Sequence, residues 1–222
     1  LAHIIRMNVK LYRYLIIILL IISSVAKSQN REFIIGSLIG FYGIENKGEI
    51  KDMYSQSNGK VWGTGGISAG LNVKHGFSKN SYGALEIRYI RKGSIYEFIS
   101  STGMGASESI HLNYFEIPLS FGLTIKLKKK HLLFEAGLAY ARMFSSKMVI
   151  SSLNPWDYSS KLTGFKRNDI SYVAIIKYPV IRNEKLLLGC RFSYSLLTIH
   201  SLYKLYNMDY GVELYYLIIT KQ

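Results

Sequence analysis

The amino-acid sequence predicts an all-β protein, an eight-stranded antiparallel up-and-down transmembrane β-barrel. Three observations predict it: strict alternation of apolar and polar residues, alternation of long and short connections, and two strand faces that differ in residue size. The alternation is clearest from Asn113 to Lys126, where a large apolar side chain occupies every second position. Successive residues of a strand point to opposite faces, whereas a helix would spread them around its axis. This segment is also longer than the usual soluble strand of roughly 5–6 residues.

The composition excludes several other classes of protein. Of the 222 residues, 49% are hydrophobic and 19% are charged, which is too apolar for a disordered chain. A single cysteine excludes a disulfide framework and a multi-cysteine zinc site. Tyrosine is frequent, with 18 residues against 10 phenylalanines. Because tyrosine has an apolar ring and a polar hydroxyl, its excess suits a surface that contacts both water and lipid.

Residues 1–28 have the pattern of a secretory signal peptide that follows a short upstream extension. Met7 is the expected start, followed by two basic residues, an apolar run from Leu15 to Ile22 and a small-x-small site that ends at Ser28. These are the three parts of a signal peptide. The apolar run is much shorter than the ~20 residues that a membrane-spanning helix needs. We therefore expect cleavage between Ser28 and Gln29 and a single barrel domain over residues 29–222.

Eight alternating segments follow in order and are predicted as strands. They cover residues 32–43, 61–75, 81–95, 110–126, 131–143, 168–179, 185–199 and 208–220. Pro118 lies inside the fourth, where the missing N–H predicts a local kink. The connections at 44–60, 96–109 and 144–167 are long, the one at 200–207 is of medium length, and those at 76–80, 127–130 and 180–184 are short. Outer-membrane barrels combine an even number of strands, short periplasmic turns and longer outer loops. The spacing therefore places the barrel in the cell outer membrane.

Residue size assigns the two faces of each strand. On one face the residues are small or polar: Thr64, Gly66, Ser68, Gly70 and Asn72 in the second strand, Glu135, Gly137, Ala139 and Ala141 in the fifth, and Gly189, Arg191, Ser193 and Ser195 in the seventh. The opposite face is bulky: Leu85, Ile87 and Tyr89 in the third strand, Phe115 to Ile125 in the fourth, and Leu188, Phe192, Tyr194 and Leu196 in the seventh. Small side chains fit the narrow interior of an eight-stranded barrel. The bulky face is therefore expected to contact lipid, with tyrosines near the strand ends as an interfacial belt: Tyr89, Tyr140, Tyr178, Tyr194, Tyr210 and Tyr216.

Charged residues occur on the inward face. They are Glu86, Arg88, Glu116, Glu135, Arg191 and Glu213. Isolated charges in a narrow interior of low dielectric are costly, so these side chains are expected to pair or to bind trapped water. An ion path or a buried catalytic carboxylate is one interpretation. A structural lumen network is the favoured one, because eight strands leave no open channel.

Two of the predicted strands resemble a known family. The segment Gly83–Gly93 (GALEIRYIRKG) is similar to the LELxYxxKG strand of PorT-like outer-membrane β-barrel proteins of the Bacteroidetes, and Leu112–Leu119 (LNYFEIPL) looks like their LxYLEIPLL strand. A signal peptide that ends in Ser28–Gln29 also fits the group. The resemblance implies an outer-membrane barrel without an established activity, which in some relatives takes part in protein secretion. The end of the chain departs from the usual terminal aromatic residue that the outer-membrane assembly machinery recognises, and Tyr216 is the nearest candidate.

An enzymatic alternative rests on histidines near the outer rim. His200 and Ser201 follow the seventh strand, and His111 begins the fourth. A His–Ser pair could activate a hydroxyl for acyl transfer, as in a lipid-A-modifying barrel, if a carboxylate oriented the imidazole. Adjacent residues of a strand point to opposite faces, so only a turn would bring the two side chains together.

No cofactor or metal site is expected, since no companion ligands accompany His75 or His131. The basic residues Lys126, Lys128, Lys129 and Lys130 are expected to lie in a solvated turn that does not bind nucleic acid.

The sequence therefore predicts a non-enzymatic outer-membrane barrel with a structural or interaction role. Its expected partners are outer-membrane lipid, the assembly machinery, and either secretion-complex proteins or an extracellular ligand that binds loop 144–167, since function concentrates in long loops. A secreted soluble barrel that binds an apolar ligand, as lipocalins do, is the second alternative.

Overall fold

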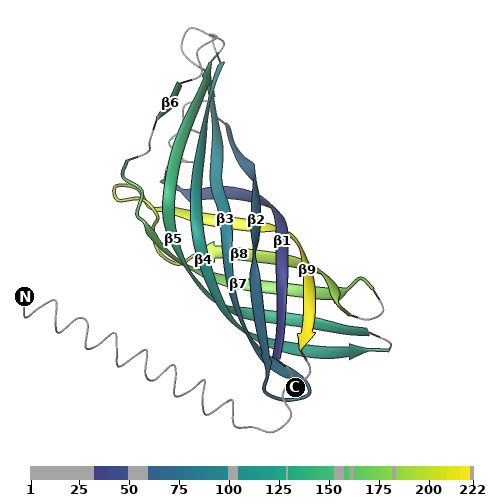
Figure 1. The fold of residues 1–222 in the computed structure, drawn as a ribbon. Coiled ribbons are helices and arrows are strands. Elements are labelled where there is room, and N and C mark those ends of the chain that lie inside the picture. Colours follow the sequence, from purple (N-terminus) through teal and green to yellow (C-terminus); the bar gives the residue numbers. More distant parts are fainter. Residues whose placement is uncertain are drawn as a thin grey trace, which may run out of the picture.

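The chain folds into a tilted, closed β-barrel with both described ends of the chain at the same rim (Figure 1). The computed structural model describes residues 33–49, 60–99, 105–128, 130–152, 158–160, 163–181 and 184–220. The predicted extension and signal peptide over residues 1–28 lie outside the described residues. No helix in the described part of the chain is long and apolar enough to cross a membrane.

Eight strands form the barrel wall. They are β1 (Phe33–Gly48), β2 (Lys60–Gly76), β3 (Ser81–Ile99), β4 (Gly105–Leu127), β5 (Lys130–Ser152), β7 (Asn168–Pro179), β8 (Leu186–Ser195) and β9 (Leu205–Thr220). Each pairs antiparallel with the next strand of the wall, and β1 closes the ring on β9 from Phe33↔Thr220 to Gly48↔Leu205. The ninth strand, β6 (Tyr158–Ser160), pairs with the outer part of β5. The predicted eight-stranded antiparallel up-and-down barrel is confirmed.

Three neighbouring strands extend far beyond the rest of the wall. β3 has 19 residues and β4 and β5 have 23 each, whereas β7 has 12 and β8 has 10. In Figure 1, β3, β4 and β5 rise together above the other strands on one side of the barrel. A membrane-spanning strand needs only about 9–11 residues, so this extension projects into the outer solvent.

The predicted long loops at 96–109 and 144–167 were therefore wrong in extent. The β4–β5 ladder continues through them, from His111↔Lys147 to Ala106↔Ser152. Outside the bilayer, backbone hydrogen bonds still hold neighbouring strands together. No lipid contacts their outer face there, so its residues need not be apolar. Hydropathy alternation fades there although the strand continues, so the pattern could not reveal the extension.

The main irregularity of the β4–β5 pair lies away from Pro118. The register shifts between Asn113 and Tyr114, where Phe144 is the extra residue on β5. Pro118 stays in register opposite Ala139 on β5. On its other side the ladder to β3 skips from Leu85↔Leu119 to Arg88↔Glu116 without changing register. The proline thus interrupts one ladder, because it lacks an N–H, and produces no bulge of its own.

The two faces of the wall are as predicted. Large apolar side chains lie outside, with Leu119 65% exposed, Phe41 62% and Leu71 60%. Their neighbours along the strands, such as Tyr114 and Glu116, are fully buried. The six tyrosines expected near the interface all lie on the outward face. The bulky surface faces away from the interior, so the structure does not favour the lipocalin-like alternative.

The interior is filled in layers. At the outer end, a large apolar cluster includes Tyr42, Ile90, Leu112 and Tyr114, with Ile199 from the β8–β9 connection and Leu205 from the start of β9. A smaller cluster of Leu38, Leu187, Tyr215 and Leu217 lies nearer the periplasmic end. Between these layers the buried side chains are polar and charged, and this middle layer is the candidate site.

Candidate functional site

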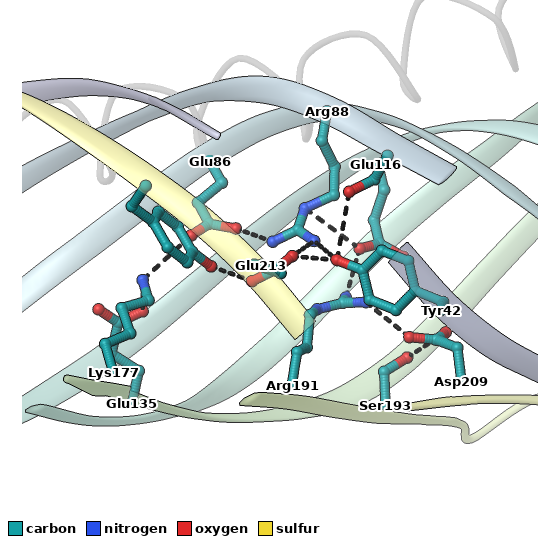
Figure 2. Close-up of polar contacts among 12 residues, drawn as sticks. Tyr42, Glu86, Arg88, Glu116, Glu135, Lys177, Arg191, Ser193, Asp209 and Glu213 are labelled. Atoms are coloured by element: carbon teal, nitrogen blue, oxygen red, sulfur yellow. Dashed lines mark hydrogen bonds and ion pairs between the residues drawn. The ribbon is translucent and has the colours of Figure 1, made fainter. Parts of the chain in front are cut away.

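The middle of the lumen holds a dense set of buried charges, here called the lumen network (Figure 2). Its cations are Lys74, Arg88, Lys92, Lys177 and Arg191, and its carboxylates are Glu86, Glu116, Glu135, Asp209 and Glu213. Every wall strand except β1 contributes at least one of these groups, and β1 contributes the phenol of Tyr42. The inward periodicity of each strand brings them together, since every second residue points to the axis.

Arg88 of β3 is the centre of the lumen network. Its guanidinium bonds Glu86 on the same strand and Glu213 on β9. Nη1 also donates to the Tyr42 hydroxyl at 2.9 Å, and Nε lies 3.8 Å from Oε1 of Glu116. Tyr42 in turn donates to Glu213. One arginine therefore joins β1, β3, β4 and β9 across the barrel, which suits the planar, multiply donating guanidinium.

Arg191 of β8 connects this centre to the outer half of the lumen. Nη2 donates to Oε1 of Glu116 at 2.5 Å, and Nη1 donates to Oδ1 of Asp209 at 2.6 Å. Lys92 lies between the same two carboxylates, with Nζ 3.1 Å from Glu116 and 3.2 Å from Asp209. The Ser193 hydroxyl donates a hydrogen bond to Oδ2 of Asp209 at 2.9 Å.

Lys177 of β7 plays the same connecting role toward the periplasmic half. Its Nζ lies 2.7 Å from Oε2 of Glu135 and 3.4 Å from Oε1 of Glu86. The same ammonium is 3.9 Å from the centre of the Tyr215 ring, a cation–π distance. Lys74 approaches Glu135 from the other side at 3.2 Å, and the Tyr82 hydroxyl donates to Glu135 at 2.8 Å.

The lumen network pairs its charges away from bulk solvent. Each of the five cations contacts at least one of the five carboxylates, and their side chains are at most 5% exposed. Buried ions tolerate low dielectric only when such partners replace their water. Chemically, the arrangement can hold strands together. It leaves none of its carboxylates in the accessible position that a catalytic acid or base would need.

All six charged residues predicted for the lumen lie in this network, but the sequence reasoning missed four members. These are Lys74, Lys92, Lys177 and Asp209. Lys74 is two residues from the inward-facing Asn72 and Lys92 is four from Arg88, so strand periodicity alone would have placed both inside. Lysine is seldom buried in proteins, and neither side chain was counted among the predicted lumen charges.

The contacts of the rim histidine His200 differ from those that the enzymatic alternative requires. Nδ1 of His200 accepts backbone N–H groups of Leu202 at 3.2 Å and Tyr203 at 3.3 Å. In a catalytic triad, the carboxylate that orients the histidine bonds to Nδ1, and here Nδ1 is already occupied by these two N–H groups. The ring lies edge-on to Phe165 at 5.0 Å, and Ser201 is exposed, with its backbone N–H bonded to the Gly164 carbonyl at 2.9 Å. His200 therefore ties the segment 163–167 to the β8–β9 connection.

The electrostatics around His200 support a packing role. Burial, and secondarily the nearby Lys166 ammonium, lower the pKa of His200, which favours the neutral ring. A neutral ring can accept the two backbone N–H groups at Nδ1. The other histidine of the enzymatic hypothesis, His111, lies within β4 opposite Lys147.

The remaining candidates lie near the periplasmic rim. Nδ1 of His131 is 2.9 Å from Glu184, and Nζ of Lys130 donates to the Pro179 carbonyl at 3.0 Å. Lys130 also lies 4.9 Å from the centre of the Tyr178 ring, so this lysine of the basic run supports the β7–β8 turn. Cys190 is exposed on the outward face. Within the described ranges, no three His, Cys, Asp or Glu side chains gather as a metal site.

Several solved outer-membrane proteins are similar to this chain. The attachment invasion locus protein Ail of Yersinia pestis is 14% identical in sequence, with a TM-score of 0.45. The aligned region covers 84% of this chain and 99% of the Ail chain. OprG of Pseudomonas aeruginosa has 10% identity and a TM-score of 0.45, and the aligned region covers 86% of this chain and 97% of the OprG chain. Neisserial surface protein A has 10% identity and a TM-score of 0.43, and the aligned region covers 83% of this chain and 96% of the neisserial chain. No curated protein sequence matches the chain.

The decisive comparison is with protein families. Residues 27–201 match the family of the outer membrane protein beta-barrel domain, which is most of the chain. The closed ring of antiparallel strands and its apolar outer surface agree with that match. The chain therefore belongs to the outer membrane protein beta-barrel domain family, and its location is the cell outer membrane.

Proposed function

We propose that this protein is a closed, non-enzymatic scaffold of the outer membrane, which acts through the surface that it exposes outside the cell. The observation that carries the proposal is the lumen network. A pore needs an open path, whereas here paired charges occupy the middle of the lumen and an apolar cluster packs toward its outer end. Holding the barrel closed is the role that we assign to this network.

The extension of β3, β4 and β5 supports an interaction role. These strands continue well past the length that a bilayer requires, and β6 adds to the outer part of β5. Elements outside the membrane that contribute nothing to spanning it are available to a partner. The predicted contact loop 144–167 falls partly within β5 and β6, while its Trp156 lies outside the described residues.

The finer assignment follows from the sequence resemblance. Similarity of Gly83–Gly93 and Leu112–Leu119 to PorT-like strands of the Bacteroidetes favours a protein linked to secretion. In this proposal residues 1–28 direct export and are removed, the assembly machinery inserts the barrel, and the outer extension contacts a secretion-complex protein or an extracellular ligand. The packing of His200 against Phe165 favours this role over the lipid-A hydrolase.

Conductance across a planar lipid bilayer tests the closed scaffold. We expect the purified wild-type protein to give no current steps, while an open porin in the same bilayer gives stable ones. The reason is that ions would have to cross a lumen filled by packed apolar side chains and by paired charges. Reproducible unitary steps from the wild-type protein would reject a closed lumen and favour a transport role.

A further inference from the structure

Three aromatic side chains form a tight group on the outward face of the extended strands. Phe144 of β5 lies 4.7 Å from Phe115 of β4 and 6.1 Å from Tyr89 of β3, measured between ring centres. The Tyr89 hydroxyl donates to Oδ1 of Asn113 at 2.8 Å. We call Tyr89, Phe115 and Phe144 the aromatic trio. Aromatic side chains on the outside of a membrane barrel mark the level of the lipid headgroups.

Basic side chains lie immediately outside the aromatic trio on the same three strands. Arg91 is two residues beyond Tyr89 along β3 toward the outer end, His111 is four beyond Phe115 along β4, and Lys147 is three beyond Phe144 along β5. His111 and Lys147 are directly paired across the β4–β5 ladder, and Arg91 pairs with Asn113 across the β3–β4 ladder. Arg91 and Lys147 are both close enough to His111 to interact with it electrostatically.

A third cation, besides Arg91 and Lys147, lies beside the trio. Arg142 is exposed and is paired with Phe115 across the β4–β5 ladder. Among the described residues, neither Arg91, Arg142 nor Lys147 forms an ion pair with a carboxylate. By contrast, Lys47 near the outer end of β1 contacts Glu45 at 2.6 Å. Like charges gathered without a counter-charge repel one another, so the cluster favours an external anion.

We propose that this surface binds the phosphorylated headgroup of a lipid in the outer leaflet, with its acyl chains against the apolar wall below. Arg91, Arg142 and Lys147 contact the phosphates, and the aromatic trio packs against the junction between headgroup and acyl chains. The position favours a lipid over a free anion, because the cations border the belt that contacts lipid. Charge-assisted bonds from arginine and lysine are suited to phosphate oxygens. The inference rests on the outer surface and does not depend on a closed lumen.

Binding of diphosphorylated lipid A to the purified barrel in detergent tests this site. Native mass spectrometry gives the fraction of barrel that carries one lipid at each lipid concentration. For the variant Arg91→Gln/Arg142→Gln/Lys147→Gln we expect the affinity to fall about tenfold to a hundredfold, from the loss of three cations near an anionic surface. The matched control Lys79→Gln/Lys126→Gln/Lys128→Gln removes three exposed cations at the opposite rim and should bind like the wild type.

Four further measurements make the result decisive. The unheated gel mobility of each variant shows that it has folded, and Arg91→Lys/Arg142→Lys should keep most of the binding. Lipid A that lacks its phosphates should bind the wild-type protein no more tightly than diphosphorylated lipid A binds the triple variant. Millimolar inorganic phosphate should not displace the lipid. Equal binding by the triple variant and the wild type overturns the site, and full displacement by inorganic phosphate shows a free-anion site in place of a lipid one.

Discussion

Replacing Arg88 with methionine is expected to lower the free energy of unfolding by about 3–5 kcal/mol, because it leaves Glu86 and Glu213 buried without their main counter-charge. Arg88 also bonds Tyr42 and approaches Glu116, so four wall strands lose their common partner. Urea unfolding in phospholipid vesicles, followed by the loss of the fast-migrating folded band on unheated gels, measures the change. The side chain is fully buried, so solvent cannot replace the lost contacts.

An ion pair outside the lumen network serves as the control. Lys47 and Glu45 are 2.6 Å apart, but their side chains are 33% and 15% exposed. Lys47→Met should cost no more than about 1 kcal/mol, as surface pairs do. Adding Glu86→Gln and Glu213→Gln to Arg88→Met should recover part of the loss, since it removes the unpaired charges. Similar losses for Arg88→Met and Lys47→Met would contradict a structural role for the network.

Replacing Leu119 with arginine is expected to impair membrane assembly. Leu119 lies on the outward face of β4 and is 65% exposed, the position of a residue that contacts acyl chains. Arginine on the lipid face near the bilayer midplane costs about 2–4 kcal/mol. The folded fraction after refolding into vesicles, and the amount of protein in the outer-membrane fraction, measure the effect.

Leu202 provides the matched control for this substitution. It is 80% exposed in the β8–β9 connection, outside the barrel wall. Leu202→Arg should leave both the folded fraction and the membrane yield close to those of the wild type. If Leu119→Arg were equally harmless, the outward face of β4 would have to contact water and the assignment of the lipid surface would be wrong.

The sequence could predict the wall of the barrel because lipid and lumen impose opposite demands on successive residues. The stretch from Phe115 to Ile125 shows both demands, and its structure matches the prediction residue by residue. The same reasoning failed where only water surrounds the strands. Residues 144–152 continue β5 although their serines and lysine show no apolar alternation.

The lumen network could be predicted only in part, for a similar reason. Glu86, Arg88 and Glu116 stand out as charges amid clear alternation. Strand periodicity places Lys177 and Lys74 on the inward face, but it does not show which charges on other strands would pair with them. Their partners come from other strands, such as Glu135 on β5, and only the closed ring brings these groups together. The cations beside the aromatic trio depend in the same way on cross-strand register.

The most direct test of the central claim, a closed barrel in the outer membrane, is the gel mobility of the wild-type protein from the detergent-extracted outer-membrane fraction, unheated against boiled. A closed ring exposes no free strand edge from which unfolding could begin. The account predicts that the protein is found in this fraction and migrates faster unheated than boiled, because SDS does not open the barrel in the cold. Recovery in the soluble periplasm, with the same mobility before and after boiling, would contradict it.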